Sequence, residues 1–508
     1  MRVSQQRTVI LDLLDLRAPE PLVVINEEDV LRLGVAGSEK VLVGLGDKYA
    51  VARLLTTKTM TPPGKILASE DVARSLRASR GQELYVLPLQ LPKSYPALIK
   101  RIRGERLSQE EFVELISDVV KGSYGEAEIA AFLLSQLYLT MNDDELTSLI
   151  KAMVETGEKV KFDEVVYDEH SIGGVPGNSK VAMIVVPTVA AFGLLIPKTS
   201  SRAITSPAGT ADTMEVLARV DLTAEEIKEV ATKTRGTLAW GGKLNLAPAD
   251  DIFVNVERRL SIDPWHQMVA SILSKKLAMG VQRLVLDIPV GRKAKVEDVE
   301  TAHQLAGLFI RQASRLGVVV RVALTFGGQP IGTSVGPALE AREALESLMN
   351  GRGSRSLVDK AMLIAAMLIE MSGKVPPGGG EEVARKIFEG GKSYEKFKQI
   401  VEAQGGNPNV KPEEIPLGKH SYTIRSHMEG AVTHIDNAAI TMIARAAGAP
   451  GDKGAGVQLH AKVGYRVNKG DPLITIYSNS YPRLEDALSL IEKYPPMIVE
   501  GMLLKVLP

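Results

Sequence analysis

The sequence predicts a multi-domain α/β protein, because three kinds of local pattern follow one another along a chain too long for one hydrophobic core. The 508 residues exceed the roughly 250 to 300 at which a single core stops growing. Strand-like runs come first, helices with capping signals follow, and strands then alternate with helices. We therefore expect an N-terminal small β-barrel, a helical domain, a large α/β domain with a mixed, mainly parallel sheet, and a C-terminal α+β domain. The expected boundaries are 1–90, 91–160 joined in space by about 248–279, 161–418 and 419–508.

A faint repeat supports the N-terminal barrel. The segments VVINEEDVLRLG (23–34) and ILASEDVARSLR (66–77) share Glu-Asp-Val, with an arginine two residues later. Each reads as an apolar strand that runs into a short helix, so the duplication predicts a pseudo-symmetric barrel. The alternative is that two unrelated amphipathic helices happen to match.

Capping boxes predict the helical domain. A short acceptor side chain covers free amides at a helix start, while an acid three residues later reaches back. Three such pairs occur, Ser108 with Glu111, Ser123 with Glu126 and Asn142 with Glu145. The apolar spacing after them suits packing of helix on helix.

Residues 160–415 alternate β-branched runs with helices, which predicts a parallel sheet covered by helices. The expected strands are VAMIVVP, LVLDIPV and VVVRVAL, and the expected helices include TAEEIKEVATKT, capped by Thr223 with Glu226, AHQLAGLFIRQASRLG and EAREALESLMN. The helix PWHQMVASILSKKLAM could instead belong with the helical domain. From residue 420 the chain reads as short strands, with Gly470-Asp471-Pro472 as a tight turn.

Composition argues against several functional classes. Lys plus Arg and Asp plus Glu number 61 each, so no global field attracts nucleic acid or an anionic membrane, and any anion site must be local. The longest apolar run, 182–198, contains two prolines and reads as a buried helix or strand, not a membrane span. The N-terminus lacks the pattern of a signal peptide, and the absence of cysteine fits a cytoplasmic location.

Two loops carry the residue types of a phosphate site. DEHSIGGVPGNSK (168–180) and SSRAITSPAGTADTMEV (200–216) are rich in Gly, Ser and Thr, and each adjoins a run suited to a central strand. Glycines allow the backbone to approach an anion, hydroxyls donate to its oxygens, and a following helix offers free amides. Neither loop contains GxxxxGK[ST] or GxGxxG. Either loop alone could be an ordinary turn, but together they favour oxyanion binding.

These loops resemble the HSTGGVGD and SGR...TGGT...D.LE signatures of the thymidine and pyrimidine nucleoside phosphorylase family. The resemblance continues through VASILSKKLAMG, LVLDIPVG, QPIGTSVGPALEAREAL and KVGYRVNKGDPLITIYS, and it covers about 410 of the 508 residues. GGVPGN, SRAITS, LSIDP and the extra N-terminal domain are more similar to the archaeal AMP phosphorylase branch. That branch implies a C-terminal domain with a β hammerhead or barrel-sandwich.

The resemblance implies phosphorolysis, in which inorganic phosphate attacks the anomeric carbon of a nucleotide and releases the base. It implies AMP as substrate, CMP and UMP as further substrates, and neither a cofactor nor a metal. The implied AMP contacts are Gly174, Ser201, Arg202, Ala203, Ile204, Thr205, Ser206, Thr210, Ser271, Lys275 and Lys295. The implied phosphate contacts are His170, Ser171, Ser200 and Thr210. Arg202 is either the charge that meets the phosphate or a support for its loop.

Asp263 matches the proposed proton donor, but Asp263-Pro264 also reads as a helix N-cap followed by proline. Ser271 and Lys275 lie one helical turn apart, so both could meet the base or ribose, although the same spacing is common on surfaces. VGRKAKV brings Arg292, Lys293 and Lys295 together, either to bind a 5′-phosphate or as a solvated basic loop.

One residue departs from the family pattern, because Glu169 stands where the family has lysine. A carboxylate there would repel phosphate unless it points away or a cation such as Lys180 or Arg202 compensates. The other histidines show no metal-ligand spacing, so we expect no metal.

Other functions remain open. A pyrimidine nucleoside phosphorylase is the nearest alternative, and a phosphoribosyltransferase is more distant. A non-enzymatic adaptor or carrier is a third alternative, because the N-terminal repeat resembles the recognition barrels of AAA ATPases and the C-terminal strands resemble biotinyl carrier domains. The resemblance also implies a homodimer or higher homo-oligomer through the helical segment. We expect the helical and α/β domains to close over the substrates, since phosphorolysis must exclude water.

Overall fold

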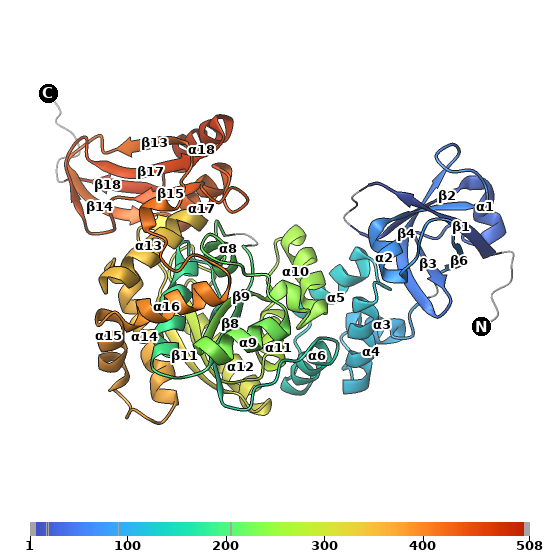
Figure 1. Ribbon diagram of the computed structural model, residues 1–508, viewed down its shortest axis with the longest axis horizontal. Helices are drawn as coiled ribbons and strands as arrows, with labels where there is room; N and C mark the ends of the chain where they lie inside the picture. The colour runs from blue at the N-terminus through green and yellow to red at the C-terminus, as the bar shows by residue number, and fades with distance from the viewer. Residues whose placement is uncertain (1–6, 17, 19, 90, 204–205, 502–508) are drawn as a thin grey trace. The chain divides into compact units, whose positions relative to one another are not determined.

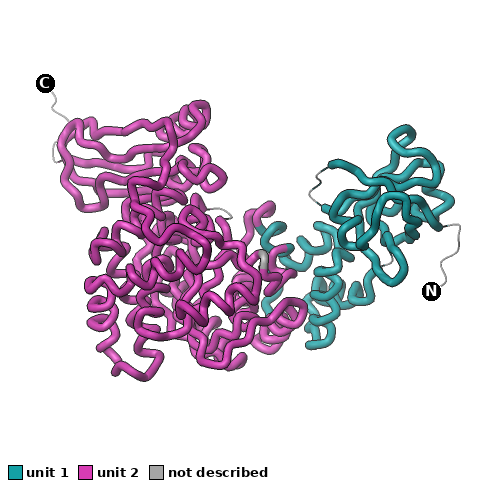
Figure 2. The backbone as a smooth tube through the Cα atoms, in the orientation of Figure 1, with its two compact units in different colours: residues 1–141, 252–257 teal, residues 142–251, 258–508 magenta. Residues whose placement is uncertain are grey.

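The computed structural model describes residues 7–16, 18, 20–89, 91–203 and 206–501, which fold into two compact units (Figures 1 and 2). The first unit comprises residues 1–141 and 252–257, and the second comprises 142–251 and 258–508. In the described part of the chain, no helix is long and apolar enough to cross a membrane.

The first unit begins with a closed six-stranded barrel, which confirms the predicted N-terminal fold. Its strand order is β1-β5-β2-β4-β3-β6. The strands are β1 (Thr8–Leu14), β2 (Leu22–Asn26), β3 (Lys40–Leu45), β4 (Lys48–Thr57), β5 (Lys65–Ser69) and β6 (Glu83–Pro88). Strand β2 runs into α1 (Glu27–Leu33) and β5 into α2 (Glu70–Leu76), so the sequence repeat is two strand-helix units. Val23, Ile25, Ile66 and Ala68 of these strands are fully buried, because both copies turn alternate side chains into one core.

Helices follow the barrel: α3 (Tyr95–Ile102), α4 (Gln109–Val120) and α5 (Glu126–Tyr138) in the first unit, and α6 (Asp143–Glu155) in the second. The capping boxes at Ser108 and Asn142 are confirmed. The box expected at Ser123 is wrong, because α5 starts only after Gly125, whose amide donates to Glu128 at 2.9 Å. The Tyr124 hydroxyl is hydrogen-bonded to Ser94 at 2.7 Å, which holds this stretch outside the helix.

The second unit is built on parallel strands. Strands β7 (Val166–Ser171), β10 (Val281–Val290) and β11 (Val319–Phe326) pair in the order β11-β10-β7, and β8 (Ile196–Ser200) pairs with β9 (Gly236–Trp240). A parallel bridge from Val166 to Leu195 places β7 beside β8. All five strands therefore point the same way, and their carboxyl ends share one edge.

Helices surround these strands (Figure 1). They are α7 (Val181–Ala191), α8 (Thr210–Met214), α9 (Ala224–Thr234), α10 (Pro248–Leu260), α11 (Trp265–Ala278), α12 (Val299–Arg315), α13 (Pro337–Asn350), α14 (Arg355–Met371), α15 (Gly380–Glu389) and α16 (Lys392–Ala403). Short 3-10 turns are η2 (Asn178–Lys180), η3 (Gly241–Leu244) and η4 (Pro412–Glu414). The capping box at Thr223 is confirmed at the start of α9.

The segment VAMIVVP is helix α7, so the strand expected there is wrong. The ten residues from Val181 to Ala190 are all buried, and α7 packs against α14 and α16. A helix buried on every side is apolar all round and shows no 3.6-residue period, so its sequence reads like a central strand.

The C-terminal part contains two antiparallel sheets, β12-β15-β17-β13 and β16-β14-β18. The elements are β12 (Ser334–Val335), β13 (His420–Arg425), β14 (Gly430–Ile435), α17 (Asn437–Ala446), β15 (Gly456–Leu459), β16 (Arg466–Val467), β17 (Pro472–Ser478), α18 (Tyr481–Lys493) and β18 (Met497–Glu500). The turn at Gly470 joins β16 to β17 as predicted, with a φ of 92° that suits glycine. Strand β12 comes from the α/β part and ties the two regions of this unit together.

Candidate active site

The two predicted loops begin at neighbouring strand ends. Strand β7 ends at Ser171 and β8 ends at Ser200, so both loops leave the carboxyl edge of the sheet, where ligands bind in open α/β folds. In the first loop, the Ser171 hydroxyl accepts from the Gly173 amide at 3.3 Å. Gly173 and Gly174 have φ angles of 80° and 86°, which fold the loop back tightly.

In the second loop, Asp212 organises the backbone. Its Oδ2 accepts from the amides of Ala203 at 2.7 Å and Gly209 at 3.1 Å. Thr210, the first residue of α8, donates to the Ser179 carbonyl at 3.1 Å, which connects the two loops. Ser206 donates to the Ala208 carbonyl and Ser200 to the Ala239 carbonyl, and Ser201 is exposed. Ile204 and Thr205 lie outside the described residues.

Arg202 is held by carboxylates and an aromatic ring. Its guanidinium contacts Glu215 Oε2 at 2.6 Å and Oε1 at 2.5 Å, and Asp212 at 3.4 Å. Its Cζ lies 4.8 Å from the centre of the Trp240 ring. The hydrogen bond to Arg202 lowers the pKa of Glu215 to about 2. This arrangement favours Arg202 as the support of the loop over Arg202 as the phosphate's charge.

His170 lies on β7 among lysines. Burial, followed by the positive charges of Lys276, Lys198, Lys275 and Lys295, lowers its pKa well below the usual value. The imidazole is therefore neutral near pH 7 and can offer one donor and one acceptor nitrogen.

A buried ionic network lies beside His170. Asp168 is fully buried and pairs with Lys276 at 2.6 Å, while Lys198 pairs with Glu169 at 2.9 Å and Asp168 at 3.7 Å. Glu169 is thus compensated by Lys198. The two cations expected for this task are engaged elsewhere, Lys180 with Glu343 at 3.0 Å and Arg202 with Glu215.

Asp168, Lys198 and Lys276 belong to the site region, although no motif in the sequence had indicated them as site residues. Their signal was a charged residue inside an otherwise apolar strand or helix, as in IPKTS and LSKKLA. Such residues are almost never buried unless paired.

Helix α11 brings Ser271 and Lys275 to one carboxylate. Asp250 Oδ2 accepts from the Ser271 hydroxyl at 2.8 Å and contacts the Lys275 ammonium at 2.7 Å. Although burial lowers the pKa of Lys275, Asp250 and Asp251 raise it above the usual value, so the ammonium stays charged. Asp250, at the start of α10, was missed because an acid in the first turn of a helix is ordinary.

Asp263 lies beside the basic loop. Its Oδ2 is 2.6 Å from Lys295 Nζ, and Gly174 packs so closely on Lys295 that an added Cβ would lie 2.7 Å from the Lys295 amide nitrogen. The N-cap interpretation of Asp263 is wrong, because Pro264 occupies that position and α11 begins at Trp265 without a side-chain cap. Arg292 and Lys293 are exposed next to Lys295.

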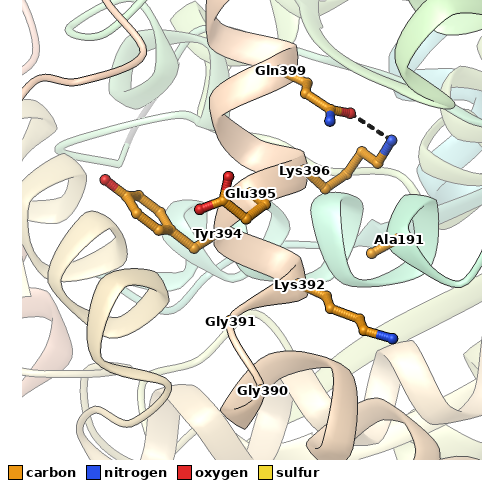
Figure 3. A pocket seen from close by; sticks show the side chains of 8 residues that line it. All are labelled: Ala191, Gly390, Gly391, Lys392, Tyr394, Glu395, Lys396 and Gln399. Atoms are coloured by element: carbon orange, nitrogen blue, oxygen red, sulfur yellow. Dashed lines mark hydrogen bonds between the residues drawn. The ribbon is translucent and has the colours of Figure 1, made fainter.

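The described residues contain no cluster of three metal-ligating side chains. A surface pocket of about 370 Å³ lies beside the start of α16 (Figure 3). Its lining residues are Ala191, Gly390, Gly391, Lys392, Tyr394, Glu395, Lys396 and Gln399. Lys396 donates to Gln399 at 2.7 Å within it, and none of the candidate residues contributes to it.

Three protein-family profiles match the chain. They are the helical bundle domain of a glycosyl transferase family at residues 95–157, the a/b domain of a glycosyl transferase family at 163–394, and the pyrimidine nucleoside phosphorylase C-terminal domain at 431–496. The multi-domain α/β architecture predicted from the sequence is confirmed at this level.

Among curated proteins, the chain is 59% identical to the AMP phosphorylase of Hyperthermus butylicus over 487 residues, covering 96% of each chain. It is 48% identical to AMP phosphorylase 1 of Archaeoglobus fulgidus, covering 95% of this chain and 96% of that one. It is 48% identical to the AMP phosphorylase of Pyrococcus furiosus, covering 97% and 98%. Anthranilate phosphoribosyltransferase from Thermus thermophilus has a similar fold, with a TM-score of 0.51 at 20% identity over 61% of this chain and 99% of that one.

Proposed function

The chain belongs to the AMP phosphorylase family, and from this premise we propose that its two loops and helix α11 catalyse phosphorolysis of AMP to adenine and ribose 1,5-bisphosphate. One observation carries the assignment of the site. Two hydroxyl-rich and glycine-rich loops leave adjacent parallel strands and are joined by the bond from Thr210 to Ser179, in the same compact unit as the lysine-bearing helix α11.

The chemistry requires a bound nucleophile, a stabilised ribose cation and a protonated leaving base. His170, Ser171, Ser200 and Thr210 would hold inorganic phosphate while one of its oxygens attacks C1′. As the bond from C1′ to the base nitrogen breaks, Asp263 would donate a proton to adenine. The neutral imidazole of His170 suits phosphate binding, because it can donate to a phosphate oxygen without forming a tight ion pair.

The 5′-phosphate would lie near Lys295, Arg292 and Lys293. These three cations sit in one short loop after β10, and Gly174 of the first phosphate loop packs against Lys295. A phosphate that bound there would compete with Asp263 for Lys295, so substrate binding would release Asp263 from this ion pair.

Ser271 and Lys275 would contact the base or ribose from α11, held by Asp250. The family resemblance supports three further proposals: CMP and UMP as substrates, a homodimer or higher homo-oligomer, and a C-terminal β hammerhead or barrel-sandwich. A cytoplasmic location and independence from nucleic acid and membranes are proposed from the absence of cysteine and the balanced charge.

Incubation of the pure protein with AMP, CMP, UMP, thymidine and uridine, each with and without inorganic phosphate, tests the function. We expect chromatography to detect adenine only when AMP and phosphate are both present. Release of thymine or uracil from the nucleosides, without release from nucleotides, would support the pyrimidine nucleoside phosphorylase alternative. Base release that needs no phosphate would contradict phosphorolysis.

A further inference from the structure

Lys453 lies in the C-terminal region, which begins with β13 at His420, and it contacts the second phosphate loop, residues 200–216. It lies between α17 and β15, and its Nζ contacts Asp212 Oδ1 at 3.1 Å and Glu215 Oε2 at 2.8 Å. Asp212 lies within α8, and Glu215 directly follows this helix. One lysine from a distant part of the sequence therefore binds two acids at this short helix.

The Lys453 backbone is itself well fixed. Its carbonyl accepts from the Ala338 amide of α13 at 3.0 Å. The preceding Asp452 accepts from the amides of Gly454 at 3.0 Å and Asn479 at 3.0 Å, which ties the segment to the end of β17. The ammonium is therefore presented from a rigid segment and not from a free loop.

Asp212 connects this lysine to the loop backbone. One oxygen of Asp212 accepts from the Ala203 and Gly209 amides, and the other faces Lys453 and Arg202. Lys453 and Arg202 together balance the charges of Asp212 and Glu215. Because the Asp212 side chain is only 4% exposed, loss of one cation would leave a buried carboxylate undercompensated.

A second cation of the same region contacts the same loop, since Arg445 of α17 donates to the Ser206 carbonyl at 3.2 Å. The C-terminal region therefore touches the loop at both ends of the stretch from Ser206 to Glu215. Thr210, which would contact both phosphate and AMP, lies between these two points.

We propose that Lys453 is a positioning residue that holds the second phosphate loop from the C-terminal region by binding Asp212 and Glu215. It acts through the loop backbone and does not touch the reacting atoms. The proposal rests on the proposed function, since the loop that Lys453 holds would contact both the attacking phosphate and AMP.

Steady-state kinetics of adenine release tests this role. Lys453→Ala should raise the KM for inorganic phosphate and the KM for AMP about tenfold each and lower kcat by less than about threefold, because the displaced loop carries Thr210, which would contact both ligands. Lys453→Arg should restore most of the loss, since it keeps the charge. Lys469→Ala, an exposed lysine in the turn before β17, is the matched control and should resemble the parent.

The outcomes separate the two proposals. If the parent protein releases no adenine, the proposed function fails. If the parent is active and Lys453→Ala leaves both KM values unchanged, or if kcat falls as much as the KM values rise, the positioning role is overturned. Glu215→Gln provides a second route should Lys453→Ala fold poorly, and it should raise the same two KM values, because the amide keeps the shape but removes the charge that Lys453 and Arg202 bind.

Discussion

At the scale of single residues, the proposed mechanism gives Asp263 the most specific chemical role. Asp263→Asn should lower kcat on the order of a hundredfold and leave the KM for AMP nearly unchanged, because the amide cannot donate the proton that adenine needs. Lys295→Met is the matched control on the other side of the 2.6 Å pair and should mainly raise the KM for AMP. Steady-state adenine release distinguishes the two patterns. An unaltered kcat in Asp263→Asn would leave Asp263 only as the ionic partner of Lys295.

Asp250 supports two candidate substrate contacts at once. Asp250→Asn should raise the KM for AMP about tenfold, because Lys275 would lose its 2.7 Å partner and Ser271 its charged acceptor. Burial would then lower the pKa of Lys275, so the alkaline limb of the pH profile should move to lower pH. Asp251→Asn is the control, since Asp251 is 53% exposed and 3.6 Å from Lys275, and it should have a smaller effect. Equal effects of the two variants would contradict a special role for Asp250.

At the scale of elements, the sequence predicted those features that have a local cause. Local patterns predicted the strand-helix repeat, three capping boxes and the two loops, because each of these features depends on residues that are neighbours in the sequence. Helix α7 and the pairing of Lys198 with Glu169 could not be predicted. Burial on all sides removes the periodicity of α7, and the partner of Glu169 comes from a strand 29 residues away.

The first phosphate loop offers a matched pair of glycines. Gly173 and Gly174 both have positive φ, but an added Cβ meets nothing within 4 Å at Gly173 and lies 2.7 Å from Lys295 at Gly174. Both alanine variants should lower stability by about 1 kcal/mol through backbone strain. Only Gly174→Ala should also raise the KM for AMP, because it displaces Lys295. Thermal unfolding and kinetics measure the two effects, and equal KM values would contradict the contact.

Lys462 makes the C-terminal region's packing sensitive to pH. It is 8% exposed and donates to the carbonyls of Pro330 and Gly332, and burial lowers its pKa from 10.5 to about 7. Between pH about 7 and pH 10.5, Lys462 binds a proton in the unfolded chain but not in the folded chain. The free energy of unfolding should therefore rise with pH over this range. Lys462→Met should lack that rise. Denaturant unfolding at pH 7 and 9, with exposed Lys469→Met as control, measures it, and parallel pH dependence of parent and Lys462→Met would contradict it.

At the scale of the whole molecule, charge is balanced globally and concentrated locally. The 61 basic and 61 acidic residues cancel, yet Lys198, Lys275, Lys276 and Lys295 all contribute positive potential at His170. Because the net charge can be counted from the sequence and is zero, the sequence could predict that any anion site depends on a local cluster of cations. It could not predict which lysines gather there, because they come from strands and helices that only the fold brings together.

Closure over the substrates is a prediction about the whole molecule, and α10 contains residues of both units. Residues 248–251 and 258–260 of α10 belong to the second unit, whereas 252–257 belong to the first.

The chain has no cysteine, so spin labels can be attached at single introduced sites. We expect the distance between labels at Glu114→Cys on α4 and Ser314→Cys on α12, both exposed, to shift when AMP and phosphate are added together. Labels at Ser314→Cys and Ser489→Cys lie within the second unit and should keep their distance. If the distance distribution between the labels at residues 114 and 314 is identical with and without substrates, the prediction of closure is contradicted. Substrate binding that closes the two units must change the population of the closed state.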